Sequence, residues 1–191
     1  VLGMGRLLLE TDLKPEQRTY AEAITQSGEA LLSLIGDILD FSKIESGTLT
    51  LDEDEVDVRG LVGGVAELLG PRAHAKNIEI AIMVAPDVPL AIRGDHVRLR
   101  QVLTNLMGNA VKFTETGGVC VVLSMANAKD GGVLKVEVRD TGVGVPPQKR
   151  HEIFQEFVQA DSSHARKFGG SGLGLAISKR LAQLMGGTVG V

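Results

Sequence analysis

The chain has 191 residues, 43 % of them hydrophobic, so it is long and apolar enough for one or two domains with a real core. Its net charge of -4 and its aromatic content of 3 %, without tryptophan, argue against a nucleic-acid partner. No apolar stretch approaches the roughly 18 residues of a membrane-spanning helix, so we expect a cytoplasmic piece, with any membrane contact made by other parts of a parent protein.

A long helical pattern dominates the first part of the chain. Residues 1–12 are typical of the end of one helix, and residues 12–17 are typical of a turn. A second helix is predicted from Pro15 to about Ile44, and Asp12 or its neighbour can cap its start. Along this helix one set of residues recurs at alternating spacings of four and three, as in a left-handed helical bundle. The set is Tyr20, Ile24, Ser27, Leu31, Leu34, Ile38 and Phe41.

A helical hairpin with one apolar stripe cannot bury that stripe alone. We therefore predict that residues 1–47 form a dimerisation hairpin, which pairs with a second copy into a four-helix bundle. Packing against upstream sequence of the same chain is an alternative that the pattern leaves open. Val1 is not a methionine and already lies in a helical pattern, so we expect a hairpin that is incomplete at its start.

A short acidic segment follows the hairpin. Residues 48–51 alternate between threonine and leucine, and residues 52–55 are all acidic, as in a solvated turn. We therefore predict a linker over 48–56.

The remaining residues, 57–191, mix helices and strands. Helical periodicity covers 58–75, 95–113 and 171–185, and strand patterns cover 77–84, 119–125, 133–138 and the end of the chain from 188. Because the strands and helices do not alternate strictly, we predict a two-layer α/β sandwich with helices on one side of a mixed sheet. The last predicted strand stops at Val191, so we expect this domain to be incomplete at its end.

Asp140 and two glycines form the first candidate binding loop. A carboxylate accepts hydrogen bonds only, so at a strand end it can pair with the exocyclic amino group of adenine, whereas guanine would present an oxygen there. Gly142 and Gly144 allow the backbone to turn closely around a base. An ordinary surface turn has the same Asp-x-Gly-x-Gly pattern, so this loop alone is weak evidence.

A second glycine-rich loop, over 169–175, leads directly into the last predicted helix. Backbone amides at a helix N-terminus make a site for phosphate oxygens, and glycines permit a close approach. The loop lacks the Walker pattern and does not follow a strand in a dinucleotide-binding unit. A flexible loop without a ligand is the alternative.

The helix predicted over 95–113 carries a third set of candidates. Asn105 and Asn109 lie four residues apart, so both amides project from one face. The Asn109 amide oxygen is a hard ligand of the sort that Mg²⁺ accepts beside water and phosphate. Lys112 can bring a positive charge toward phosphates, and Phe113 offers an aromatic face. Either asparagine alone is more typical of an ordinary polar face.

Taken in chain order, these elements resemble the N, G1, F and G2 boxes of the catalytic domain of sensor histidine kinases. That domain is of the gyrase, heat-shock chaperone, histidine kinase and MutL ATPase type. The resemblance covers nearly the whole chain, and three further runs are similar to hybrid-type kinases: 37–47, 95–101 and 157–161.

The resemblance implies that the domain binds ATP and Mg²⁺ and transfers the γ-phosphoryl group to a histidine on the bundle, and from there to an aspartate of a response regulator or receiver domain. Asn109 is implied as the metal ligand. Asn105 is implied as the catalytic residue; related hydrolases carry a glutamate there, so an amide without useful basicity favours transfer over hydrolysis. The implied ATP-binding residues are Asn105, Asn109, Lys112, Phe113, Asp140, Gly142, Gly144, Phe154, Phe157, Arg166, Lys167, Gly170, Ser171, Gly172, Leu173 and Gly174.

The sequence departs from the family in one respect, because the phosphoacceptor motif His-Glu/Asp-x-x-Thr/Asn is absent. By resemblance, that histidine would lie roughly two to three helical turns upstream of Val1. The four histidines present, His74, His96, His151 and His164, are expected to be surface or structural residues. Two alternative functions remain at this point, a kinase-like scaffold without catalysis and an ATP-hydrolysing relative.

Overall fold

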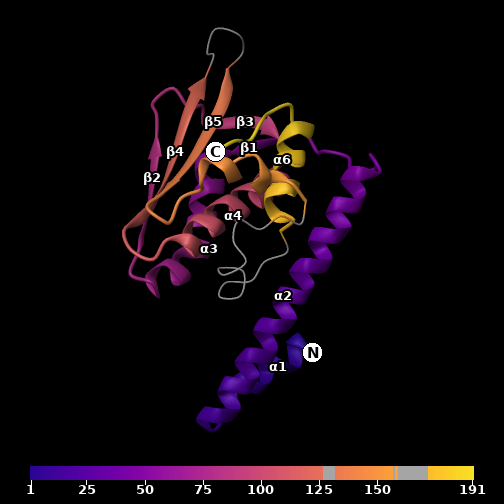
Figure 1. Ribbon diagram of the computed structural model, residues 1–191, viewed down its shortest axis with the longest axis vertical. Helices are drawn as coiled ribbons and strands as arrows, with labels where there is room; N and C mark the ends of the chain where they lie inside the picture. The colour runs from indigo at the N-terminus through magenta and orange to yellow at the C-terminus, as the bar shows by residue number, and fades with distance from the viewer. Residues whose placement is uncertain (127–131, 157, 159–171) are drawn as a thin grey trace. The chain divides into compact units, whose positions relative to one another are not determined.

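The computed structural model describes residues 1–126, 132–156, 158 and 172–191. These residues divide into two compact units, Val1–Leu49 and Thr50–Val191. In Figure 1 the first unit contains α1 and α2, and the second contains the strands and the other helices. Across the described ranges, none of the helices combines the length and the apolar composition that a membrane span requires.

The first unit is a helical hairpin of α1 (Leu2–Leu9) and α2 (Pro15–Glu45). Small residues let the two helices approach closely, since a Cβ on Gly5 would lie 2.6 Å from the Thr25 hydroxyl oxygen and one on Gly28 would lie 2.7 Å from a Leu2 methyl carbon. The long helix predicted from Pro15 is thus confirmed.

The two ends of α2 show different local chemistry. Its first turn is fixed by the Gln17 side-chain oxygen, which accepts a hydrogen bond from the Lys14 N–H at 3.0 Å. The prediction that Asp12 or its neighbour caps α2 was therefore wrong, because the chain enters the helix two residues later, at Lys14. The other end closes at Ser46 and Gly47, whose φ of 66° suits glycine.

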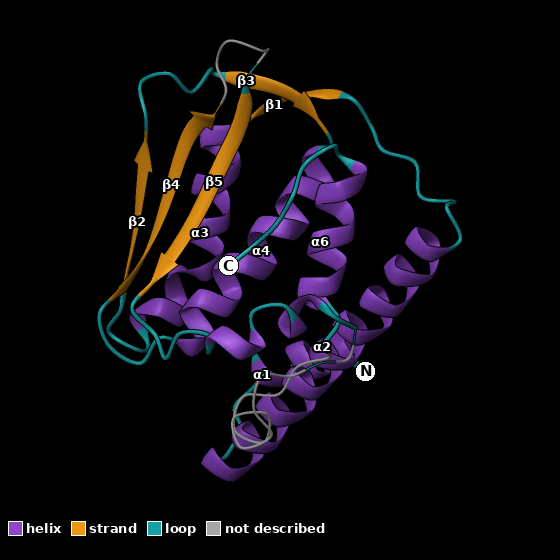
Figure 2. Cartoon of the chain, turned by 45° about the horizontal axis from the view of Figure 1, so that its top comes forward, coloured by secondary structure: helices purple, strands orange, loops and turns teal. Residues whose placement is uncertain are grey.

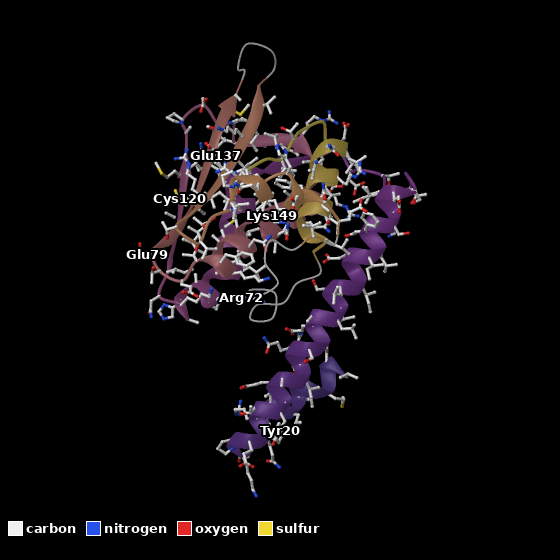
Figure 3. The ribbon with its side chains drawn as sticks, viewed as in Figure 1. Tyr20, Arg72, Glu79, Cys120, Glu137 and Lys149 are labelled. Atoms are coloured by element: carbon white, nitrogen blue, oxygen red, sulfur yellow. The ribbon has the colours of Figure 1, made fainter. Side chains whose placement is uncertain are left out.

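One face of α2 is apolar and exposed within its own unit. Tyr20, labelled in Figure 3, is 67 % exposed, Leu31 is 59 % exposed and Ile38 is 52 % exposed. Ile24 and Leu34 of the predicted seam are exposed as well. The hairpin alone therefore leaves the seam unburied, as its pattern predicted.

The second unit contains two small sheets. β1 (Asp54–Asp57) pairs antiparallel with β3 (Ala91–Gly94). β2 (Glu79–Val84) runs parallel to β4 (Gly118–Ala126), which in turn pairs antiparallel with β5 (Val133–Asp140). The second sheet is therefore mixed, as predicted.

Helices cover one face of the mixed sheet (Figure 2). They are α3 (Val58–His74) and α4 (His96–Phe113). α6 (Gly174–Leu184) packs against α4, and the short 3-10 turns η2 (Pro147–Lys149) and η3 (Glu152–Phe154) precede it in the chain. The core between the layers holds Val62 and Val65 of α3, Met107 of α4, and Val121 and Leu123 of β4, all fully buried. This arrangement is the predicted two-layer sandwich.

Two predicted segments differ from the structure. Residues 54–56 were expected in a solvated linker but belong to β1, because Val56 is buried in the core while its acidic neighbours point outward. Residues 188–191 were expected to begin a strand but adopt no regular structure, since no described backbone hydrogen bond pairs them with a neighbouring strand.

A buried carboxylate, Asp95, starts α4. It is 4 % exposed, and its two oxygens accept hydrogen bonds from the N–H groups of Arg98 at 3.0 Å and Asp52 at 3.1 Å. Burial by itself would raise the pKa of Asp95, but the N–H groups of Arg98, Asp52 and Val97, together with the charge of Arg98, outweigh burial and hold the pKa below its ordinary value. Asp95 thus ties the start of α4 to the segment that leads into β1.

Replacing Asp95 by alanine should lower the free energy of unfolding of the second unit by about 2 kcal/mol at pH 7, since a helix cap and a second charge-assisted hydrogen bond are lost. Because the folded-state pKa is depressed, this contribution is present above the unfolded-state value and is lost as the pH falls through the folded-state pKa. Urea titrations of wild type and variant at pH 7 and pH 3, followed by circular dichroism, measure the difference.

Asp57 provides a matched control. It caps α3 through one hydrogen bond from the Gly60 N–H at 3.0 Å and is exposed, so Asp57→Ala should cost only about 1 kcal/mol. Equal costs at the two caps, or a cost of Asp95→Ala that does not change with pH, would contradict this account of Asp95.

Candidate nucleotide-binding site

The candidate site is built on α4. Four predicted site residues of α4 are half-buried, and their spacing places them along one side of the helix. They are Asn105, Asn109, Lys112 and Phe113. The opposite side carries Met107 and its neighbours into the core. The same amphipathic pattern that buries one face of α4 therefore presents the other face as a polar surface.

The middle of α4 is joined to α6 through Asn105. Its side-chain amide donates a hydrogen bond to the hydroxyl of Ser178, which is 2 % exposed, at 2.8 Å. Its amide oxygen lies so close to Gly174 that a Cβ there would collide with it. Asn109 donates to the same oxygen over a longer distance, 3.4 Å. The structure thus gives Asn105 a packing contact that its predicted catalytic role did not include.

The end of α4 meets the loop that follows β5. The Gly142 N–H donates to a carboxylate oxygen of Asp140 at 2.9 Å, which fixes the carboxylate at the strand end. A Cβ on Gly142 would lie 2.6 Å from the Phe113 carbonyl oxygen, so only glycine permits this approach. Gly144 has a φ of 67°, in the left-handed region that glycine favours. Phe113, Asp140 and Gly142 are therefore brought together.

Thr141 fastens this loop to the start of β4. Its hydroxyl donates to the Thr116 carbonyl at 2.8 Å and accepts from the Gly118 N–H at 3.0 Å. Gly117, with a φ of 96°, lies directly against that hydroxyl. Sequence reasoning missed Thr141, although its place between Asp140 and Gly142 was the available signal.

Lys112 adds a positive charge at the end of α4. Its ammonium lies 4.9 Å from the centre of the Phe113 ring, within the range of a cation–π contact. Burial lowers the pKa of Lys112 from its ordinary value. Lys112, predicted to contact phosphate, and Phe113, predicted to contact the base, are therefore in contact with each other.

The N-terminus of α6 carries the last predicted glycines. The helix begins at Gly174, three residues later than predicted, after Gly172 with a φ of 70°. Leu173 is 1 % exposed, so its side chain belongs to the core and only its backbone can face a ligand. Five predicted residues lie outside the described part of the chain: Phe157, Arg166, Lys167, Gly170 and Ser171.

Phe154 lies on η3, which packs against α6, and its ring centre is 6.0 Å from the ammonium of Lys179. A pocket between these two elements has a volume of about 410 Å³ and is lined by both residues. Among the described residues, Phe154 is the one predicted site residue that lines it. Within the same described ranges, no cluster of three or more histidine, cysteine, aspartate or glutamate side chains could hold a metal ion.

Comparison with known proteins identifies the family of this chain. The model of the histidine kinase-, DNA gyrase B- and HSP90-like ATPase family matches residues 94–191, which include α4, the Asp140 loop and α6. The chain belongs to this family. Residues 1–47 match the His Kinase A (phospho-acceptor) domain.

The curated relatives include a sensor protein and a signal transduction histidine-protein kinase. The chain is 45 % identical to the sensor protein GacS of Pseudomonas syringae pv. syringae and 41 % identical to the signal transduction histidine-protein kinase BarA of Escherichia coli K12. These matches cover 100 % and 99 % of this chain, and 21 % of each relative. The chain therefore spans about a fifth of the length of these two relatives.

The crystal structure of full-length ShkA in complex with AMPPNP is similar over the whole chain, with 49 % identity and a TM-score of 0.81. The match covers 38 % of ShkA. The helical hairpin and the α/β sandwich thus occur in the same order in a solved protein of this family.

Replacing Gly174 by alanine should destabilise the second unit by about 1 kcal/mol, because the added methyl group displaces the Asn105 amide from its hydrogen bond with Ser178 and loosens the contact of α6 with α4. Gly63→Ala is the control, since Gly63 lies inside α3 with open space around its Cβ position and should stabilise by about 0.5 kcal/mol through helix propensity. Urea unfolding measures both, and a Gly174→Ala variant as stable as the wild type would show that this contact does not fix α6.

Proposed function

We propose that this chain binds MgATP and is the catalytic core of a two-component sensor histidine kinase. The observation that carries the proposal is the continuous set of contacts along α4: Asn105 meets α6 at Gly174, and Phe113 meets the Asp140 loop at Gly142. A nucleotide lying along this side of α4 would reach the base-binding loop at one end and the N-terminus of α6 at the other. The similarity to ShkA, whose solved complex contains the ATP analogue AMPPNP, supports this reading.

The adenine end is formed by Asp140 and its glycines. The Asp140 carboxylate, held by the Gly142 N–H, accepts a hydrogen bond from the adenine amino group. Gly142 and Gly144 permit a close approach of the base, and Phe113 offers apolar contact. Phe154, which lies beside α6, is assigned a lid contact. An oxygen acceptor in place of the amino group, as in guanine, is disfavoured.

The phosphate end is formed by Asn109, Lys112 and the N-terminus of α6. Asn109 would offer one hard oxygen ligand to Mg²⁺, an ion that accepts a single protein oxygen beside water and phosphate. Lys112 and the amides of Gly172–Gly174 stabilise the phosphate charge. We assign supporting phosphate or lid contacts to the remaining predicted residues, Phe157, Arg166, Lys167, Gly170 and Ser171.

The chemistry is phosphoryl transfer. Asn105 has no useful basicity, and its amide is bonded to Ser178, so it does not activate water for hydrolysis. The γ-phosphoryl group passes to a histidine on the helical bundle of the parent protein and then to an aspartate of a response regulator or receiver domain. The name of BarA, a signal transduction histidine-protein kinase, supports this reading over a scaffold or an ATP-hydrolysing relative.

The hairpin supplies the dimer in this proposal. Residues 1–47 form the dimerisation hairpin, a connector begins at residue 48, and residues 57–191 form the ATP-binding domain, extended at its start by β1. The exposed apolar face of α2 supports a homodimer, because a monomer would leave these side chains in water.

Titration calorimetry of residues 1–191 with MgATP should show binding that Asp140→Ala weakens at least about thirtyfold, the loss expected for a hydrogen bond to a charged group. Asn109→Ala should remove the strengthening by Mg²⁺ while keeping the affinity for ATP alone. Neither wild type nor variant should release phosphate, because Asn105 has no useful basicity to activate water.

Asp87→Ala is the control for the Asp140 variant, since Asp87 is an exposed carboxylate on the turn after β2. It should bind MgATP like the wild type. No binding by folded wild-type protein would reject the proposed function and favour the scaffold.

Sedimentation velocity should show a dimer that Leu31→Glu shifts to monomer, because a charge placed in the apolar face of α2 cannot be buried without a partner. Ser33→Glu places the same charge two residues along α2, off the predicted seam, and should remain dimeric. A monomeric wild type, or equal behaviour of the two variants, would contradict the proposed dimer.

A further inference from the structure

Lys76 lies in the turn between α3 and β2, outside every motif of the candidate site. Its half-buried side chain reaches the C-terminal end of α4. There its ammonium donates hydrogen bonds to the carbonyl oxygens of Val111, Lys112 and Thr114, at 2.9, 2.6 and 3.1 Å. Three acceptors from one helix end therefore converge on one cation.

This arrangement suits the end of a helix. The last four carbonyl groups of a helix have no N–H partner within it, and they carry the negative end of the helix dipole. An ammonium has three donors and no acceptor, so it matches three carbonyl groups, and hydrogen bonds from a charged donor are the stronger ones. Thr114 is fully buried, so water cannot readily replace Lys76 there.

The end of α4 that Lys76 holds is also the end that carries the ligand-facing groups. Lys112 offers its backbone carbonyl to Lys76, while its own ammonium lies over the Phe113 ring. The Phe113 carbonyl lies against Gly142 of the Asp140 loop. A change in the last turn of α4 would therefore move the phosphate-binding cation, whereas the Asp140 loop is also held by Thr141 against the start of β4.

We propose that Lys76 is a positioning residue for nucleotide binding: by bonding the carbonyls of Val111, Lys112 and Thr114, it fixes the last turn of α4 so that Lys112 points at the phosphate groups. This inference rests on the proposed function, because it assigns a role within the same site. Lys76 does not itself contact the nucleotide; it acts through Lys112.

The decisive experiment compares two ligands on two matched variants. Lys76→Met removes the ammonium and keeps the length of the side chain. Arg72→Met removes the same charge from an exposed position on the last turn of α3, labelled in Figure 3. Calorimetry with residues 1–191 then measures the affinity of each protein for AMPPNP and for adenosine, which lacks phosphate groups.

Lys76→Met should bind AMPPNP about tenfold more weakly than the wild type and should lose less than about threefold for adenosine. Lys76→Arg, which keeps a charged donor, should recover most of the AMPPNP affinity. Arg72→Met should match the wild type with both ligands. If Lys76 had a purely structural role, Lys76→Met would instead lower the apparent affinities for AMPPNP and for adenosine by the same factor. That factor is the fraction of the protein that remains competent to bind.

Three results would overturn the inference: Lys76→Met binding AMPPNP like the wild type, equal losses for the two ligands, or an equal loss in Arg72→Met. If Lys76→Met does not fold, Lys76→Gln, which keeps two amide donors, is measured against the same expectations. Failure of the wild type to bind AMPPNP would reject the proposed function itself. If the wild type binds AMPPNP and the Lys76 variant binds it equally well, only the role of Lys76 is rejected and the proposed function stands.

Discussion

The placement of α4 is the constraint on which the second unit depends. One side of this helix is core, and the other side carries Asn105, Asn109, Lys112 and Phe113, so any rotation or shift would move all four together. Charged groups hold it at both ends. The Asp95 carboxylate satisfies N–H groups at its start, and the Lys76 ammonium satisfies carbonyl groups at its end.

These charges are placed as helix electrostatics requires, with the anion at the N-terminus and the cation at the C-terminus. Each also joins α4 to a different segment, since Asp95 bonds the chain that enters β1 and Lys76 belongs to the turn after α3. A third bond, from Asn105 to Ser178, joins its middle to α6. The helix is therefore defined by three connections to sequence-distant segments, and the candidate site takes its geometry from them.

The hairpin obeys a different constraint. Its two helices approach each other closely at two small residues, Gly5 and Gly28. The remaining apolar face of α2 stays exposed within the unit, so its burial requires further helices. The second unit has its own closed core between helices and sheet, which is why the two units are stabilised by different means.

The sequence by itself determined the types and order of the main helices and of β2, β4 and β5, whereas β1 and β3 were not predicted. The 3.6-residue periodicity predicted α2, α3 and α4, alternation predicted β4 and β5, and the spacing of Asn105 and Asn109 placed both on one face. Local motifs also identified Asp140 and its glycines, because the residues that favour a turn lie next to one another in the sequence. Only the tertiary structure decided that residues 54–56 pair with β3, that Asn105 packs on Gly174 and Ser178, and that Lys76 caps α4. Each of these contacts joins residues more than 30 positions apart, and no periodicity or local propensity records which distant segments the packed core brings together.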